Sequence, residues 1–286
     1  MVLESLLKVM QAEKKPWEAF IVGFLYSSVA LFLSLWIFRQ QASLVMIFLT
    51  SLAAVPLIYN TIKVEEKKDI CIDSESTLLK EHRKAVSVYL YLFLGFIISF
   101  ALWYAVLPAS LLHDLFRTQT QTILDINNRV TGRLSSESLI LLSTIFLNNV
   151  KVLIFCILFA FLYGFGAIFI LTWNASVIST AIGNFIRINL ANSADLVGLT
   201  KVGKYLHIVS LGLFKYAIHG IPEIVAYIIA GITGGIISVA VIKHDFGTRK
   251  FENIVLDTSS LLMLALGLLV IAAVLEVYVT PLFFLD

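Results

Sequence analysis

The chain has 286 residues, of which 59% are hydrophobic and 14% are charged. Soluble globular domains carry about 25% charged residues, so the composition excludes an ordinary soluble domain and indicates a polytopic membrane protein. The net charge of +2, without a long Lys/Arg tract, does not indicate nucleic-acid binding, so no nucleic-acid partner is expected.

The N-terminal part predicts a surface helix followed by a transmembrane hairpin. Residues 2–10 place apolar side chains at 2, 3, 6, 7, 9 and 10, the pattern of an amphipathic helix lying on a membrane or of an ordinary helix docked on the protein. The apolar run 19–38 exceeds the length of a signal-peptide core and is predicted as an uncleaved span. A second span, 42–62, follows after only Arg39, Gln40 and Gln41.

The middle of the chain predicts two more spans and interfacial helices. The charged segment 63–85 leads into a third span at 86–107, which is followed by the long segment 108–149. Within that segment an amphipathic helix is predicted from Leu111 to Ile126 and a second one near Leu139 to Leu147. The fourth span is predicted at 151–172.

The C-terminal part predicts three further spans, 205–221, 223–242 and 258–280. The fifth span is short, contains His207, Lys215 and His219, and ends at Gly220 and Pro222, which predicts a broken or re-entrant helix. The fold class is therefore all-α: a polytopic transmembrane bundle of about seven spans with interfacial helices.

Lys and Arg favour the cytoplasmic side of a membrane. With the N-terminus inside, the predicted inner segments hold 15 of these residues and the outer ones 5. This bias predicts a multi-pass cell-membrane protein with a cytoplasmic N-terminus and an outer C-terminus.

Ionisable residues in or at the ends of apolar runs predict a site, because such residues are costly at membrane depth. In His219-Gly220-Ile221-Pro222-Glu223, Pro222 suits the first turn of a helix, where a carboxylate is also favoured. The topology places other polar residues at similar depth, so a polar cluster is predicted from Asn149, His219, Glu223, Glu276 and Thr280. Three uses stay open: interhelical hydrogen bonding, a cation or proton site, and catalysis.

Small residues predict close helix packing. Gly231 and Gly235 form a G-x-x-x-G pattern on the sixth span, and such faces let helix backbones approach closely. Packing within the chain and a homodimer contact are the two uses considered.

The motif inventory predicts that the chain is not an enzyme. It contains no zinc-binding His-Glu-x-x-His, no Gly-x-Ser-x-Gly and no phosphate-binding loop. We expect no metal and no cofactor. An intramembrane hydrolase would require a bound metal.

Several motifs resemble the stage II sporulation protein M family. They are Phe146-Leu147-Asn148-Asn149, His-Gly-Ile-Pro-Glu at 219–223, Ala-Gly-x-x-Gly-Gly at 230–235 and Ala272-Ala273-x-x-Glu276-x-x-x-Thr280-Pro281. The resemblance covers about residues 86–286. It implies a non-enzymatic membrane component with five spans matching the third to the seventh, and shared positions at His219, Gly220, Glu223 and Glu276. The family's namesake acts as a scaffold for cell-wall hydrolases. Many relatives have Asn-Gly where this chain has Asn174-Ala175.

Two segments are expected: residues 1–85, with the surface helix, hairpin and charged loop, and the family-like domain 86–286. We hypothesise a membrane scaffold or assembly factor that is embedded in the lipid bilayer. Protein partners and a second copy of the chain are the contacts considered for it. The alternative is a transporter or channel for an ion or small solute that uses the same cluster.

Overall fold

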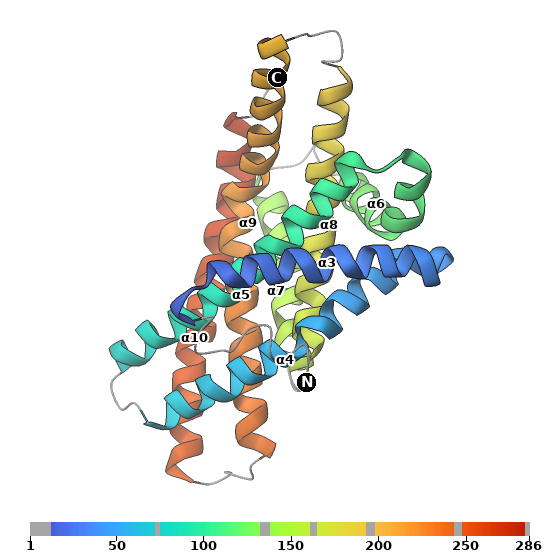
Figure 1. The fold of residues 1–286 in the computed structure, drawn as a ribbon. Helices are drawn as coiled ribbons and strands as arrows, with labels where there is room; N and C mark the ends of the chain where they lie inside the picture. Colours follow the sequence, from blue (N-terminus) through green and yellow to red (C-terminus); the bar gives the residue numbers. More distant parts are fainter. Residues whose placement is uncertain are drawn as a thin grey trace.

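A computed structural model describes residues 13–71, 75–131, 138–160, 165–192, 198–242 and 248–283. Every regular element in these ranges is helical (Figure 1). In chain order they are α3 (Trp17–Ile37), the 3₁₀ turn η1 (Arg39–Gln41), α4 (Ala42–Cys71), α5 (Glu75–Val106), α6 (Ala109–Thr131), α7 (Ser138–Ala160), α8 (Phe165–Ala191), α9 (Gly198–Ile242), α10 (Arg249–Val274), the π-helical turn η2 (Leu275–Val279) and the 3₁₀ turn η3 (Thr280–Phe283).

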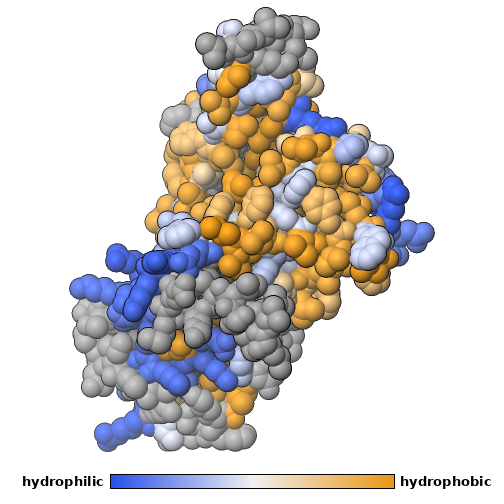
Figure 2. Space-filling model, viewed as in Figure 1, coloured by the Kyte–Doolittle hydropathy of each residue, from blue (hydrophilic) through white to orange (hydrophobic). Residues whose placement is uncertain are grey.

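Seven of the described helices are long and apolar enough to cross a membrane: α3, α4, α5, α7, α8, α9 and α10 together with η2 and η3. The predicted all-α, seven-span class is therefore confirmed. Apolar side chains dominate the upper and middle parts of the face in Figure 2, whereas hydrophilic ones gather towards its lower part. The surface helix predicted at residues 2–10 lies outside the described residues.

The N-terminal hairpin forms as the sequence predicts. Phe38 leaves the helical conformation (φ −129°, ψ 46°) and ends α3, after which η1 turns the chain into α4. The charged segment extends α4 to Cys71 and begins α5 at Glu75. At the corner of the hairpin, Arg39 donates to the carboxylate of Asp114 on α6 over 2.8 Å.

α3 packs along α5 at very close range. At Gly23 on α3, an added Cβ would collide with the backbone of Leu92, and at Gly95 on α5 it would collide with the backbone of Phe20. The absence of side chains at these two glycines allows the backbones to meet. The N-terminal hairpin is therefore packed directly against α5.

The predicted fourth span, 151–172, is wrong in its bounds. Its residues belong to two helices, α7 ending at Ala160 and α8 beginning at Phe165. The helix predicted near Leu139 to Leu147 is the first part of α7, which is itself a candidate span. The reason is physical: residues 161–164 are uncharged and mostly apolar, so hydropathy carries no mark of the boundary.

The predicted break at Gly220 and Pro222 is not present, and the fifth and sixth predicted spans form one helix, α9. Ending a helix inside hydrocarbon would leave several backbone groups unsatisfied, whereas an internal proline removes a single hydrogen bond. The chain therefore continues helically through Pro222. α9 has 45 residues, or about 67 Å at 1.5 Å per residue, so it must tilt or extend past a hydrocarbon core about 30 Å thick.

Candidate functional site

α9 carries three polar residues that recur every four positions. His219, Glu223 and Tyr227 therefore lie near one face of the helix. On α7, Asn149 and Cys156 are seven residues apart and share a face for the same reason. The packing of α7 on α9 brings these two faces together.

Asn149 and Glu223 make the central contact of the predicted cluster. The side-chain amide of Asn149 donates a hydrogen bond to Oε1 of Glu223. Asn149 is buried, and Glu223 is partly buried. A buried carboxylate needs such donors because hydrocarbon cannot solvate it, so this bond joins α7 to α9.

The other contacts of the predicted cluster involve the turns that follow α10. Nδ1 of His219 lies 3.2 Å from Oγ1 of Thr280, within hydrogen-bonding distance. Glu276 is close enough to Glu223 for their carboxylates to interact electrostatically. The structure thus brings Asn149, His219, Glu223, Glu276 and Thr280 together from α7, α9 and the end of α10, and these five residues are called the polar cluster below.

The backbone around Glu276 is unusual. Residues Leu275–Val279 form a π-helical turn, followed directly by a 3₁₀ turn at Thr280. π turns are rare and recur at functional sites, where the wider turn redirects side chains. The sequence does not predict this turn, because no proline or glycine lies within it.

Two residues near the cluster were not predicted from the sequence. Tyr227 is 3% exposed and lies close enough to Glu223, Glu276 and Cys156 for electrostatic interaction. Cys156 is a fully buried free cysteine. The four-residue spacing from Glu223 was the signal that could have identified Tyr227. Lys151, two residues after Asn149 on α7, is exposed.

The cluster is suited to hydrogen bonding or to holding a proton or monovalent cation. Two neighbouring carboxylates repel each other when both are ionised, and a proton or cation relieves that repulsion. In the part of the chain that the structure describes, no group of three His, Cys, Asp or Glu side chains is arranged to hold a metal ion.

The predicted packing glycines face helices of the same chain. An added Cβ at Gly231 would lie 3.3 Å from Cβ of Ala167 on α8, and one at Gly235 would lie 2.6 Å from the end of the Ile62 side chain on α4. Of the two uses considered for this face, the structure places both glycines in packing within the chain.

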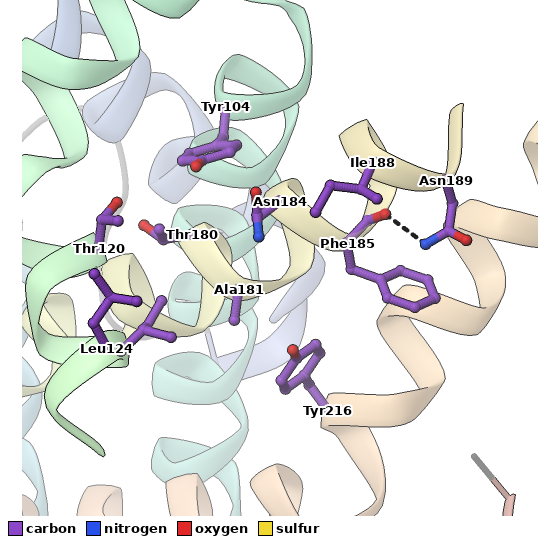
Figure 3. Close-up of a pocket in the computed structure, with 11 residues that line it drawn as sticks. Tyr104, Thr120, Leu124, Thr180, Ala181, Asn184, Phe185, Ile188, Asn189 and Tyr216 are labelled. Atoms are coloured by element: carbon purple, nitrogen blue, oxygen red, sulfur yellow. Dashed lines mark hydrogen bonds between the residues drawn. The ribbon is translucent and has the colours of Figure 1, made fainter. Parts of the chain in front are cut away.

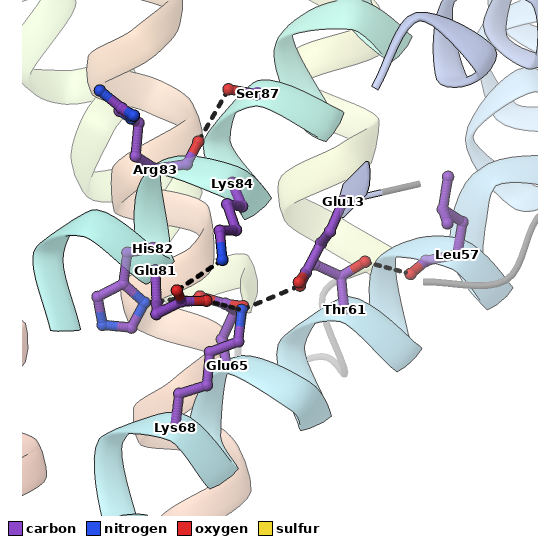
Figure 4. Close-up of polar contacts among 10 residues, drawn as sticks. All are labelled: Glu13, Leu57, Thr61, Glu65, Lys68, Glu81, His82, Arg83, Lys84 and Ser87. Atoms are coloured by element: carbon purple, nitrogen blue, oxygen red, sulfur yellow. Dashed lines mark hydrogen bonds and ion pairs between the residues drawn. The ribbon is translucent and has the colours of Figure 1, made fainter. Parts of the chain in front are cut away.

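A second polar site joins α4 to α5 (Figure 4). Glu65 is fully buried and contacts Lys68 Nζ at 2.7 Å and His82 Nδ1 at 2.7 Å. Lys68 also lies 3.0 Å from Glu13 and 3.7 Å from Glu81. We call these five residues the ion-pair network. From the sequence, the charged segment 63–85 was predicted only as the link between the hairpin and the third span, and the burial of Glu65 and His82 was not predicted.

Two adjoining cavities lie where α5, α6 and α8 meet. The first, of about 380 Å³, also borders Tyr216 on α9, and Figure 3 shows side chains from all four helices surrounding it. The second, of about 510 Å³, shares Tyr104, Thr120 and Asn184 with the first. No residue of the polar cluster lines either of these two cavities.

Comparison with known proteins identifies one family. The sequence model of the family described as Stage II sporulation protein M matches residues 88–281. Searches of curated proteins and of solved structures give no match. The matched range begins within α5 and contains the whole polar cluster.

Proposed function

The chain belongs to the stage II sporulation protein M family, and we propose that it is an integral membrane scaffold or assembly factor without catalytic activity. In this proposal the polar cluster fixes α7, α9 and the end of α10 relative to one another. The fixed bundle then presents its remaining surfaces to protein partners.

The hydrogen bond from Asn149 to Glu223 is the observation that carries this proposal. This bond pairs two polar side chains of the cluster with each other across two helices of the same chain. The contact of His219 with Thr280 pairs two more. Groups that satisfy each other in this way stabilise a bundle. A transport pathway would instead require water to reach them.

α6 is the element best suited to meet a partner. It is amphipathic, follows the third candidate span and is not itself a candidate span. Its Leu115 and Phe116 are fully buried against the bundle, whereas the side chain of His113 is 73% exposed. One face of α6 therefore anchors the helix, and the other remains accessible.

We propose that the N-terminus is cytoplasmic and the C-terminus lies outside. Arg187 on α8 donates to the carbonyl of Leu107 over 2.7 Å, so the C-terminal end of α8 lies beside that of α5 rather than with the predicted inner segments. With this correction the inner segments hold 12 Lys and Arg and the outer ones 8. The excess of Lys and Arg in the inner segments is therefore smaller than predicted, but it still favours a cytoplasmic N-terminus. Labelling of a cysteine added at the C-terminus of intact cells tests it.

Ion flux separates the scaffold from the alternative, a transporter or channel. The proximity of Glu223 and Glu276 favours that alternative, because paired carboxylates can bind and release a proton or cation. The full chain in liposomes is tested for H⁺, Na⁺ and K⁺ flux, with Glu276→Gln as the site variant and Glu252→Gln on α10 as the control. If the protein is a scaffold, liposomes that contain it should show the same ion flux as empty liposomes. Flux that only Glu276→Gln abolishes establishes the transporter.

A further inference from the structure

The two adjoining cavities share Tyr104, Thr120 and Asn184, and we treat them as one groove with two chemically different ends. Its wider part is lined by His113, Arg117, Gln121 and Arg187 together with apolar residues, and no acidic side chain is among the lining residues. Its narrower part has no charged lining residue and includes Ile123, Leu124, Phe185 and Ile188. We call this feature the amphipathic groove.

The basic end of the groove carries positive charge because Arg117 and Arg187 line it and no acidic residue is among its lining residues. Asp114 accepts a hydrogen bond from Arg39, outside the groove, although its other oxygen lies 3.6 Å from His113. Asp125 does not line the groove, is exposed to solvent and accepts a hydrogen bond of 2.9 Å from the neutral Gln121. Arg117 therefore presents a positive charge without a neighbouring carboxylate among the groove residues.

Arg187 is held in place at the same end. Its Nη1 donates to the carbonyl oxygens of Leu107 and Tyr104, over 2.7 and 3.5 Å. A guanidinium has five N–H groups, and these two contacts use one of its three nitrogens. The remaining nitrogens suit two-point binding of a phosphate, which arginine favours.

The apolar end continues from the basic end along α6 and α8. Leu124 is 49% exposed and Ile188 is 52% exposed. Both line the cavity together with Phe185 and Tyr216 (Figure 3). Exposed apolar side chains beside a cavity favour an apolar occupant.

The groove also lies at the right level for a lipid. It is built at the ends of the candidate spans, which finish at Val106 on α5 and Ala191 on α8. Lipid phosphates gather at this boundary, so the basic residues of the groove lie at the level of anionic headgroups.

We propose that the amphipathic groove binds an anionic phospholipid. The phosphate lies at Arg117 and Arg187, and an acyl chain runs along Leu124, Phe185 and Ile188. This inference goes beyond the scaffold proposal and does not depend on it.

Native mass spectrometry of the full chain, released from detergent, tests the site. The protein is titrated with phosphatidylglycerol and with phosphatidylcholine of the same acyl chains. Inorganic phosphate and glycerol 3-phosphate test whether the headgroup alone is sufficient. The variants are Arg117→Gln at the basic end and Leu124→Gln at the apolar end. Their controls are Lys204→Gln and Leu206→Gln, two exposed positions on α9 that do not line the groove.

Phosphatidylglycerol should bind in preference to phosphatidylcholine. Arg117→Gln should lower the affinity for phosphatidylglycerol about fivefold, as expected for one basic residue near a membrane surface. Leu124→Gln should lower the affinity for both lipids, and the controls should behave as wild type. Equal binding of the two lipids, an unchanged affinity in Arg117→Gln, or equal binding of free phosphate would overturn the proposal.

Discussion

Asn149 on α7 donates a hydrogen bond to Glu223 on α9, across 74 residues of sequence. Glu276 approaches the same carboxylate from the end of α10. Three helices that are distant in the chain therefore meet at one acidic side chain. A hydrogen bond inside a membrane bundle contributes about 0.6 kcal/mol on average and up to about 1.7, so the cluster stabilises the bundle through several contacts together.

Thr280→Val should destabilise the bundle moderately. The change removes the hydroxyl that faces His219, at a cost of about 0.6 to 1.7 kcal/mol. Thermal unfolding of the full chain in a mild detergent measures it. Ser259→Ala is the matched control, because Ser259 is exposed and its hydroxyl donates to the carbonyl of Val255 in its own helix. An equal loss of stability in both variants would show that the hydroxyl of Thr280 has no special role in the polar cluster.

Lys68→Met should lower the stability of the fold more than Thr280→Val does. Glu65 is fully buried and would lose one of its two partners, and breaking a buried ion pair costs about 3 to 5 kcal/mol. Lys84→Met is the control, because Lys84 is half exposed and water screens its pair with Glu81 at the surface. Chemical unfolding of the two variants compares them, and similar stabilities would contradict the prediction.

Gly234→Ala and Gly267→Ala should change stability in opposite directions. An added Cβ at Gly234 would lie 2.8 Å from the carbonyl oxygen of Ile157 and 2.8 Å from Cβ of Ala160, whereas at Gly267 nothing lies within 4 Å. Overpacking costs about 1 to 3 kcal/mol, while alanine in an open helix position gains about 0.5 to 1. A higher melting temperature for Gly234→Ala would show that α7 and α9 are not closely packed.

The contribution of the Asp114 carboxylate to the stability of the fold should disappear in acid. The hydrogen bond from Arg39 lowers the pKa of the Asp114 carboxyl below its ordinary value of 3.8, and attraction to Arg39 and His113 adds to the effect. Because the folded-state pKa is the lower one, the stabilisation is complete above the unfolded pKa and is lost as the pH falls through the folded pKa.

Melting temperatures of wild type and Asp114→Asn, measured against pH, test this expectation. The variant should be less stable by a constant amount above about pH 5 and should approach wild type below about pH 4. A difference that grows as the pH falls would have the wrong sign. Asp125→Asn, at an exposed position on the same helix, serves as the control.

The sequence predicted the hairpin and the residues of the cluster for clear physical reasons. Arg39, Gln40 and Gln41 interrupt a long apolar stretch, so the turn before α4 is visible in hydropathy. Glu223 and Glu276 stand out because carboxylates are rare and costly within apolar runs.

The remaining features depend on information that hydropathy lacks. The boundary between Ala160 and Phe165 falls in an apolar stretch, and Pro222 reads equally well as a helix start or as an internal residue. The burial of Glu65 follows from the packing of α4 on α5, which pairs it with His82. A charge count along the chain cannot show that pairing.

A double-mutant cycle between Asn149→Leu and Glu223→Gln tests the central claim most directly, namely that the polar cluster holds α7 and α9 together. The free energy of unfolding of wild type, both single variants and the double variant is measured in one detergent. A coupling energy of about 0.6 to 1.7 kcal/mol is expected, with each single variant less stable than wild type. Additive effects, with no coupling between the two positions, would contradict it.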